Sequence, residues 1–343
     1  MRSGFAGTTS IPAGETRMVR SLRRILAGLL MGLFLVNEAP ATDLPTIRVG
    51  LLKFGTVNWE MQLLREGLDR KHGFILSPSM LADREANSIA LMGGDVDVIV
   101  TDWIWVAKQR ALGRDFTFVP FSRSVGAVMA DPATGIKSIA DLKGHSIGVA
   151  GGASDKSWVL LRAYAQKTLG LDLAKEVDAQ FSAPPMLNEL LLRGKLDAVL
   201  NYWQFNARLK EKGMVPVISI ADILPALGIE TPPPLLGWVF SENWAKANPT
   251  AAAGLIDASY EAKGIMKTDD AAWSRLRPLM DAETDAVFNA LKAGYRDGIP
   301  EGYGPTDVAA AQIAFKEMRA IDPNAVADLE ALPDGTFWPD FRP

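Results

Sequence analysis

Apolar and β-branched residues gather into short runs along this chain, and two of these runs open similar stretches about one hundred residues apart. The first run, at 46–52, reads TIRVGLL, and the second, at 145–150, reads HSIGVA. Short runs of this composition predict β-strands. A glycine-containing loop follows each run, and apolar residues then recur at helical spacing over 59–71 and 156–169. The pattern therefore predicts a strand, a loop and a helix in each stretch.

The similarity continues beyond the two predicted helices. Residues 91–97 read LMGGDVD and residues 191–197 read LLRGKLD, which predicts a helix that ends at a glycine and runs into a strand. We expect these strands at 96–100 and 198–200. Strands alternating with helices in both copies predict an α/β fold with parallel sheets. A chance match is the alternative, because the shared residues are few and of common types.

The loops after the predicted strands are candidate ligand-binding segments. In open α/β sheets, ligands bind beyond the carboxyl ends of the strands. The loops are 53–58 and 151–158 in the first part of each copy, and 101–103 and 201–204 in the second part. If two related lobes face each other, these loops line one shared cleft.

Aromatic and hydroxyl-bearing residues in or beside these loops have the chemistry of a small-molecule site. Aromatic rings offer flat apolar faces, and serines at a helix N-terminus can donate to an anion. For each aromatic residue, packing against the sheet is the alternative, and for Asp102 and Asp155 it is helix capping. Arg123 either neutralises an acidic ligand or lies on the solvated surface. The expected ligand-binding residues are Phe54, Trp59, Thr101, Asp102, Trp103, Ser124, Ser154, Ser157, Asn201, Tyr202 and Trp203.

One segment resembles a known family. Residues 135–149 read GIKSIADLKGHSIGV, which is similar to the entry to the second lobe of the periplasmic solute-binding proteins of ABC importers. The chain resembles their nitrate, sulfonate and taurine branch, which also contains binders of thiamine-pyrimidine precursors and of riboflavin. Residues 92–98, 184–186 and 191–198 support the resemblance.

The resemblance implies a two-lobed periplasmic-binding-protein-like fold of type II, in which two doubly wound α/β lobes are joined by two crossover strands. The outgoing crossover is expected at 125–129 and the return at 236–240. Lobe one then comprises residues 42–130 and 236–343, and lobe two comprises residues 131–235. The helices predicted after the return crossover are expected to pack on lobe one.

Composition and charge argue against several other functions. The chain carries 36 basic and 40 acidic residues and has no basic cluster, so a nucleic-acid partner is not expected. His72 and His145 are the only histidines, and neither lies near a nucleophile or a cluster of metal ligands. We expect no catalytic residue, no metal and no cofactor. Asp97 and Asp197 recur in both copies and are interpreted as structural. The related synthase of the thiamine pyrimidine needs cysteines, and this chain has none.

The beginning of the chain has the pattern of a secretory signal. An apolar run at 25–36 is too short to span a bilayer, and 39–41 reads APA, as at a signal-peptidase site. We expect translation to start at Met18 and cleavage to follow Ala41; an uncleaved anchor is the alternative. The basic residues ahead of the run are Arg20, Arg23 and Arg24. Without a cysteine there is no lipid tether, so a Gram-negative periplasmic location is predicted, with no stable membrane insertion.

The predicted function follows from the resemblance and the candidate cleft together. We expect a monomeric solute-binding protein that closes about a hinge on a small organic anion, such as a sulfonate, taurine or nitrate, and delivers it to an ABC permease and its ATPase. A pyrimidine or flavin precursor is an alternative ligand. A membrane sensor kinase is an alternative partner.

Overall fold

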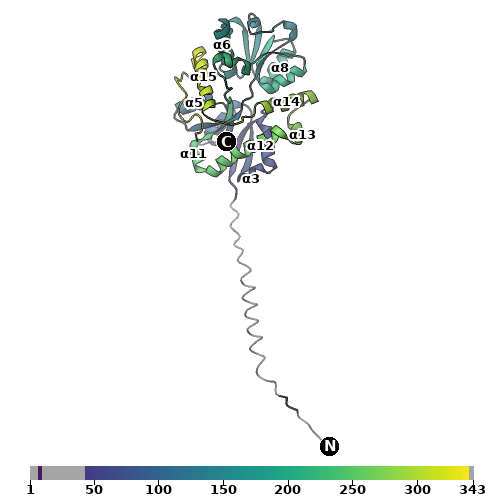
Figure 1. Ribbon diagram of the computed structural model, residues 1–343, viewed down its shortest axis with the longest axis vertical. Helices are drawn as coiled ribbons and strands as arrows, with labels where there is room; N and C mark the ends of the chain where they lie inside the picture. Colours follow the sequence, from purple (N-terminus) through teal and green to yellow (C-terminus); the bar gives the residue numbers. More distant parts are fainter. Residues whose placement is uncertain (1–6, 10–42, 340–343) are drawn as a thin grey trace. The chain divides into compact units, whose positions relative to one another are not determined.

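The computed structural model describes residues 7–9 and 43–339 (Figure 1). The predicted signal region, with Arg20, Arg23, Arg24, the apolar run, the cleavage site at Ala41 and the start at Met18, lies outside the described residues. Within the described part of the chain, no helix combines the length and the apolar character that crossing a membrane requires.

Two five-stranded sheets form the framework of residues 44–339, and their strands have the same spatial order. The first sheet has the order β2-β1-β3-β10-β4, and the second has the order β7-β6-β8-β5-β9. The first sheet comprises β1 (Thr46–Leu52), β2 (Ile75–Leu81), β3 (Val98–Thr101), β4 (Phe116–Ser122) and β10 (Leu236–Ser241). The second comprises β5 (Ala127–Ala130), β6 (Ser146–Ala150), β7 (Asp178–Ser182), β8 (Ala198–Asn201) and β9 (Val215–Ser219).

The matching sheets confirm the internal repeat. β1 runs parallel to β2 and β3, and β6 runs parallel to β7 and β8. The recurring aspartates have the same structural contact in both copies. Asp97 accepts a hydrogen bond from the backbone N–H of Arg48, and Asp197 accepts one from that of Ser146, both at 2.8 Å. Each carboxylate thus joins the start of the first strand to the approach of the third.

Each sheet contains one antiparallel strand from the other half of the chain. β5 follows β4 in sequence but pairs with β8 and β9, and β10 returns to pair with β3 and β4. The chain therefore passes between the sheets twice, before Ala127 and before Leu236. The lobe boundaries stay a prediction, and the pairing of β5 favours a first boundary near 126 rather than after 130.

Helices cover both sheets. In Figure 1, α6 and α8 lie beside the second sheet, and α11 and α12 lie beside the first. The helix predicted at 156–169 is present with the same bounds, whereas the one predicted at 59–71 begins at Val57 and passes into a π-helical turn. The longer helices are α2 (Val57–Leu63), α4 (Arg84–Gly93), α5 (Trp103–Ala111), α6 (Lys156–Leu169), α8 (Pro184–Leu192), α9 (Trp203–Glu211), α11 (Glu242–Ala247), α12 (Pro249–Thr268), α13 (Asp270–Leu276), α14 (Asp285–Asp297) and α15 (Pro305–Ile321).

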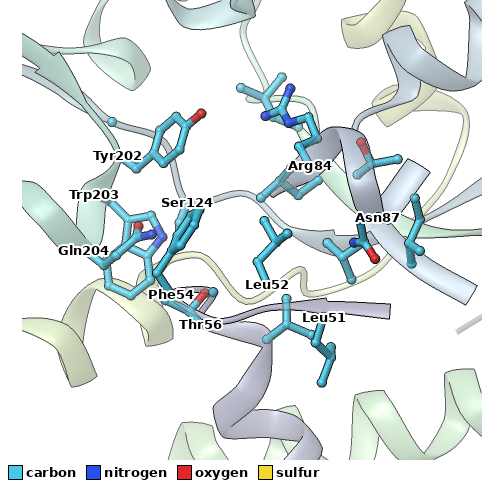
Figure 2. A pocket seen from close by; sticks show the side chains of 18 of the residues that line it. Leu51, Leu52, Phe54, Thr56, Arg84, Asn87, Ser124, Tyr202, Trp203 and Gln204 are labelled. Carbon is cyan, nitrogen blue, oxygen red and sulfur yellow. The ribbon is translucent and has the colours of Figure 1, made fainter. Parts of the chain in front are cut away.

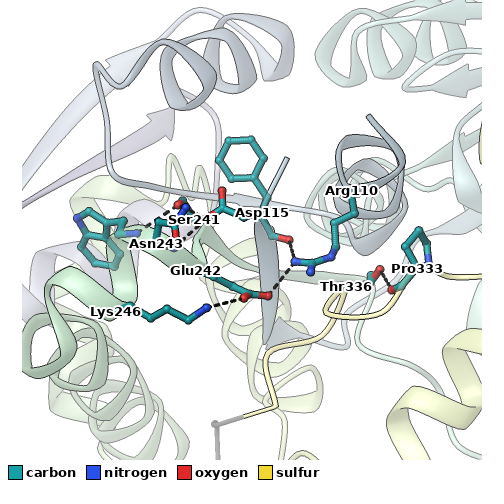
Figure 3. A network of polar contacts seen from close by, with 10 residues as sticks. Arg110, Asp115, Ser241, Glu242, Asn243, Lys246, Pro333 and Thr336 are labelled. Atoms are coloured by element: carbon teal, nitrogen blue, oxygen red, sulfur yellow. Dashed lines mark hydrogen bonds and ion pairs between the residues drawn. The ribbon is translucent and has the colours of Figure 1, made fainter. Parts of the chain in front are cut away.

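A polar network holds the return strand in the first sheet (Figure 3). Arg110, near the end of α5, donates to the carbonyl oxygen of Phe116 on β4 and to Glu242 at the start of α11, both at 2.9 Å. Asp115 accepts the hydroxyl of Ser241 and the N–H of Asn243, both at 2.8 Å. Burial acts to raise the pKa of Asp115, but these hydrogen bonds outweigh it and lower the pKa. The network joins α5, β4 and the end of β10.

The C-terminal helices contact elements of both sheets, which differs from the expectation that they pack on lobe one alone. α15 packs against α6, where Arg162 and Asp322 pair at 3.5 Å. α14 packs against α9, and the adjoining loop pairs Glu283 with Lys212 at 2.9 Å. Because α6 and α9 belong to the second half of the repeat, these helices connect the two halves beyond the crossovers.

Candidate ligand-binding cleft

A cavity of about 130 Å³ lies between the two sheets. Its lining comes from the carboxyl end of β1 and the loop after it, from the end of β3, and from the start of α4 in the first half. The second half contributes the first residues of α6 and α9, and the outgoing crossover passes alongside. The cavity therefore lies beyond the carboxyl ends of the parallel strands of both sheets, where the repeat predicted a shared cleft.

One part of the cavity is apolar. Leu51, Leu52 and Phe54 line it from β1 and the following loop, and Trp203 lines it from the start of α9 (Figure 2). Trp203 meets Trp59 edge-on, with ring centroids 6.1 Å apart and planes at 87°. Trp59 is buried beneath the cavity and in turn packs against Trp273. The aromatic wall is thus supported by a second layer of rings.

Another part of the cavity carries positive charge. Arg84, near the start of α4, and Lys156, the first residue of α6, both line it. Asp102 lies behind them: its Oδ2 is 3.2 Å from Nη1 of Arg84 and 3.7 Å from Nζ of Lys156. Burial acts to raise the pKa of Asp102, but Lys156, Arg84 and the N–H of Trp105 outweigh it and hold that pKa below its ordinary value. The carboxylate is therefore ionised.

Tyr202 adds a hydrogen-bond donor close to the cations. Its hydroxyl and the Arg84 guanidinium lie on the same side of the cavity (Figure 2). Burial, assisted by the carboxylate of Asp155, raises the pKa of Tyr202 to about 12, although Arg84 acts to lower it. The phenol thus keeps its proton at neutral pH and can donate it to an acceptor on a ligand.

Two buried polar groups in the lining lack a partner. The Oδ1 of Asn87 on α4 and the hydroxyl of Thr101 at the end of β3 form no hydrogen bond with the described residues. A buried polar atom without a partner costs roughly 1–3 kcal/mol. A ligand that hydrogen-bonds to these groups would recover part of that cost, so both are candidate contacts.

The structure places the predicted residues in two groups. Those that line the cavity are Phe54, Thr101, Ser124, Ser157, Tyr202 and Trp203. Those outside its lining are Trp59, Asp102, Trp103, Ser154 and Asn201.

The residues outside the lining have structural contacts or face solvent. Trp103 is fully buried and packs near Phe337, with ring centroids 6.3 Å apart. Asn201 donates to the carbonyl oxygen of Pro184 and to Asn188, and it accepts from the N–H of Tyr202. Ser154 is exposed on the loop before α6.

Asp102 and Asp155 both cap helices, which was the alternative to a ligand contact for each of them. Asp102 accepts the N–H of Trp105 at 2.9 Å and so begins α5, and Asp155 accepts the N–H of Ser157 at 2.9 Å and so begins α6. Asp155 therefore places a carboxylate at the N-terminus of α6, and the positive charges in the cavity lining are the side chains of Arg84 and Lys156. Arg123 lies outside the lining and pairs with Asp307.

Five polar lining residues were not predicted from sequence: Thr56, Arg84, Asn87, Lys156 and Gln204. Thr56 lies in the loop at 53–58, which the sequence had already indicated. Arg84 and Asn87 follow β2, whose apolar pattern is interrupted by Ser77, Pro78 and Ser79. A strand predicted at β2 would have indicated the start of α4 as a further candidate segment, because ligands bind beyond the carboxyl ends of the strands. Lys156 and Gln204 belong to segments already singled out, and their cavity-facing positions depend on how each helix begins.

Solved structures share this architecture. The periplasmic aliphatic sulphonate binding protein SsuA from Escherichia coli is 15% identical, with a TM-score of 0.69 over 87% of this chain and 93% of that one. The alkanesulfonate-binding protein SsuA from Xanthomonas axonopodis pv. citri, bound to MOPS, is 16% identical, with a TM-score of 0.68 over 87% of this chain and 99% of that one. A Candida albicans protein described as having the generic periplasmic binding protein fold is 15% identical, with a TM-score of 0.56 over 85% of this chain and 94% of that one.

These likenesses, together with the paired sheets and the cleft between them, define a protein with the periplasmic-binding-protein fold, as predicted. The family described as "NMT1/THI5 like" matches residues 80–269, which is more than half of the chain, and the chain belongs to that family. The family resemblance seen in the sequence is therefore confirmed. No curated protein sequence matches the chain.

Proposed function

We propose that this chain is the solute-binding component of an ABC import system and captures a small organic anion with an apolar portion. The observation that carries the proposal is the polarised cavity between the two sheets. Arg84 and Lys156 provide positive charge in one part of it, and Leu52, Phe54 and Trp203 provide an apolar surface in another. The sulfonate-binding relatives named above support this choice of ligand class.

The arrangement suits capture by closure of two lobes. Arg84 and Phe54 belong to the half that contains the first sheet, whereas Lys156 and Trp203 belong to the half that contains the second. A ligand that contacts all four residues is held from both sides, so it stabilises the closed arrangement by its greater affinity for that arrangement. We propose that a permease and its ATPase receive the solute from this closed form, in the periplasm, without chemical change.

Binding is tested by thermal shift and calorimetry on the purified protein, with straight-chain alkanesulfonates and carboxylates, nitrate, pyrimidines and flavins as probes. A ligand at about 100 times its Kd adds roughly 2.7 kcal/mol of stability. We expect alkanesulfonates to shift the melting temperature upward and to be recovered unchanged. A shift by a pyrimidine or flavin alone would replace the proposed ligand class, and turnover of the probe would refute the binding role.

The anion contact is tested with Arg84→Gln, which removes the charge and keeps a polar side chain. We expect at least about a tenfold loss of alkanesulfonate affinity, because a charge-assisted hydrogen bond contributes roughly 1.5–3 kcal/mol. Arg193→Gln is the matched control, since Arg193 is an exposed arginine at the end of α8 that pairs only with Glu189 among the described residues. Equal affinities for both variants would contradict the anion contact.

A further inference from the structure

Asp102 has an unusual place in the cleft: it contacts both cavity cations without lining the cavity. Its carboxylate is buried, contacts Arg84 and Lys156, and is not part of the cavity lining. It would therefore act on a bound ligand electrostatically, directly through its charge and indirectly through the two cations, without touching the ligand. Since Lys156 belongs to the other half of the repeat, this carboxylate also joins the two halves at the cleft.

Cations line the cavity, and carboxylates lie close behind its lining; Lys108, outside the lining, also acts on Asp102. Arg84 and Lys156 supply two positive charges, and Asp102 offsets one of them directly. Asp155, the buried N-cap of α6, adds a second negative charge near Tyr202. A bound anion is attracted by the two cations of the lining and repelled by the two buried carboxylates. The carboxylate of Asp102 repels each unit of ligand charge, so it weakens the binding of a doubly charged ligand more than that of a singly charged one.

Building on the proposed function, we infer that Asp102 makes the cleft selective for anions with a single charge and against anions with two. The ligand class is thus narrowed to singly charged oxyanions such as sulfonates, sulfate esters and carboxylates. Doubly charged phosphate esters of the same shape are disfavoured by their charge and not by their size. Asp102 acts as a selectivity residue through space.

The size of the effect follows from the distance of the carboxylate from the ligand. An anion on the cavity side of the two cations lies roughly 6 Å from Asp102, and at an effective dielectric constant of about 20–40 each unit of ligand charge then changes affinity by about tenfold to a hundredfold. The loss in the logarithm of the affinity is therefore twice as large for a ligand with two charges as for a ligand with one. Asp102 therefore contributes about tenfold to a hundredfold to the preference between them.

Asp102→Asn removes the charge with little change in shape. The amide oxygen can still accept the N–H of Trp105, so the cap of α5 is retained. Asp83→Asn is the matched control, because Asp83 is also an N-cap aspartate, accepting the N–H of Ala86 at 2.8 Å, but is exposed and forms no ion pair among the described residues. Both substitutions remove one negative charge from the same half of the repeat.

The experiment measures the affinities of butyl sulfate and butyl phosphate by calorimetry at pH 7.5, for the wild-type protein and both variants. The two esters have nearly the same shape, but the phosphate carries almost two charges because its second pKa is about 6. We expect the wild type to prefer the sulfate at least about tenfold, Asp102→Asn to shift that ratio by tenfold or more toward the phosphate, and Asp83→Asn to leave the ratio unchanged.

The outcomes separate this inference from the proposed function. A wild type that binds butyl sulfate, with a ratio that Asp102→Asn does not move, overturns the inference and leaves the proposed function standing. A wild type that binds neither ester and no alkanesulfonate overturns both. A uniform loss of affinity in Asp102→Asn, with the ratio constant, assigns Asp102 a purely structural role and also overturns the inference.

Discussion

Trp103 and Trp203 occupy equivalent positions in the two copies of the repeat, each at the start of a helix that follows a strand, yet the structure gives them different surroundings. Trp103 is fully buried, whereas Trp203 lines the cavity. We therefore expect Trp103→Ala to reduce the stability of the protein and Trp203→Ala to reduce its affinity for ligand.

The magnitudes follow from burial. Truncating a fully buried tryptophan to alanine costs about 3–5 kcal/mol, which is a large share of a typical total stability of about 5–15 kcal/mol. With a denaturant slope of about 3 kcal/mol per molar urea, Trp103→Ala should lower the urea midpoint by about 1 M or more. Loss of a ring that packs on the ligand removes about 0.5–1.5 kcal/mol beyond the area effect, so Trp203→Ala should weaken binding at least roughly two- to tenfold.

The assay is urea unfolding followed by fluorescence, together with calorimetry using the alkanesulfonate that binds most tightly. Trp203→Phe is the control, because it keeps a flat ring in the cavity wall and should retain most of the affinity. Equal losses of affinity for Trp103→Ala and Trp203→Ala, with the urea midpoint of Trp103→Ala unchanged, would refute the assignment of one ring to the core and the other to the cleft.

Three further predictions concern the stability of the protein. The carboxylate of Glu60 is buried 2.6 Å from Nζ of Lys263, so Lys263→Met leaves it without its cation and should lower the free energy of unfolding in urea by about 3–5 kcal/mol. Adding Glu60→Leu should restore part of the lost stability, and no recovery would argue against a charge effect. The pKa of Asp102 is lowered in the folded protein, so its ionised carboxylate stabilises the fold above about pH 4, and this contribution is lost as the pH falls further. The free energy of unfolding, measured between pH 2 and pH 6, should therefore fall less steeply with acid in Asp102→Asn than in the wild type. Gly126→Ala places a methyl group 2.0 Å from the carbonyl oxygen of Asn201 and should cost about 1–3 kcal/mol; an unchanged melting temperature would contradict that close approach.

Local sequence patterns accounted for the elements and for where the cavity between the sheets lies. The strand at 46–52 and the helix at 156–169 have the predicted bounds, because their apolar spacing and the glycine that ends the helix are properties of neighbouring residues. The repeat placed four loops at the carboxyl ends of parallel strands, and the cavity has contributions from all of them. The helix predicted at 59–71 was less accurate, because Gly67, with a φ of 130°, interrupts its regular geometry.

Which side chains face the ligand space was decided by contacts between segments far apart in the chain. The segment around Phe337 approaches Trp103 and α14 approaches Trp203, and no pattern near either tryptophan encodes these contacts. Arg84 became a cleft residue because β2 pairs with β1 and so brings α4 to the shared edge. The residue pattern and the family resemblance together predicted an α/β protein with a cleft between two related lobes. The tertiary structure alone decided that Asp102 lies behind two cations from different halves, because that arrangement exists only once both sheets are in place.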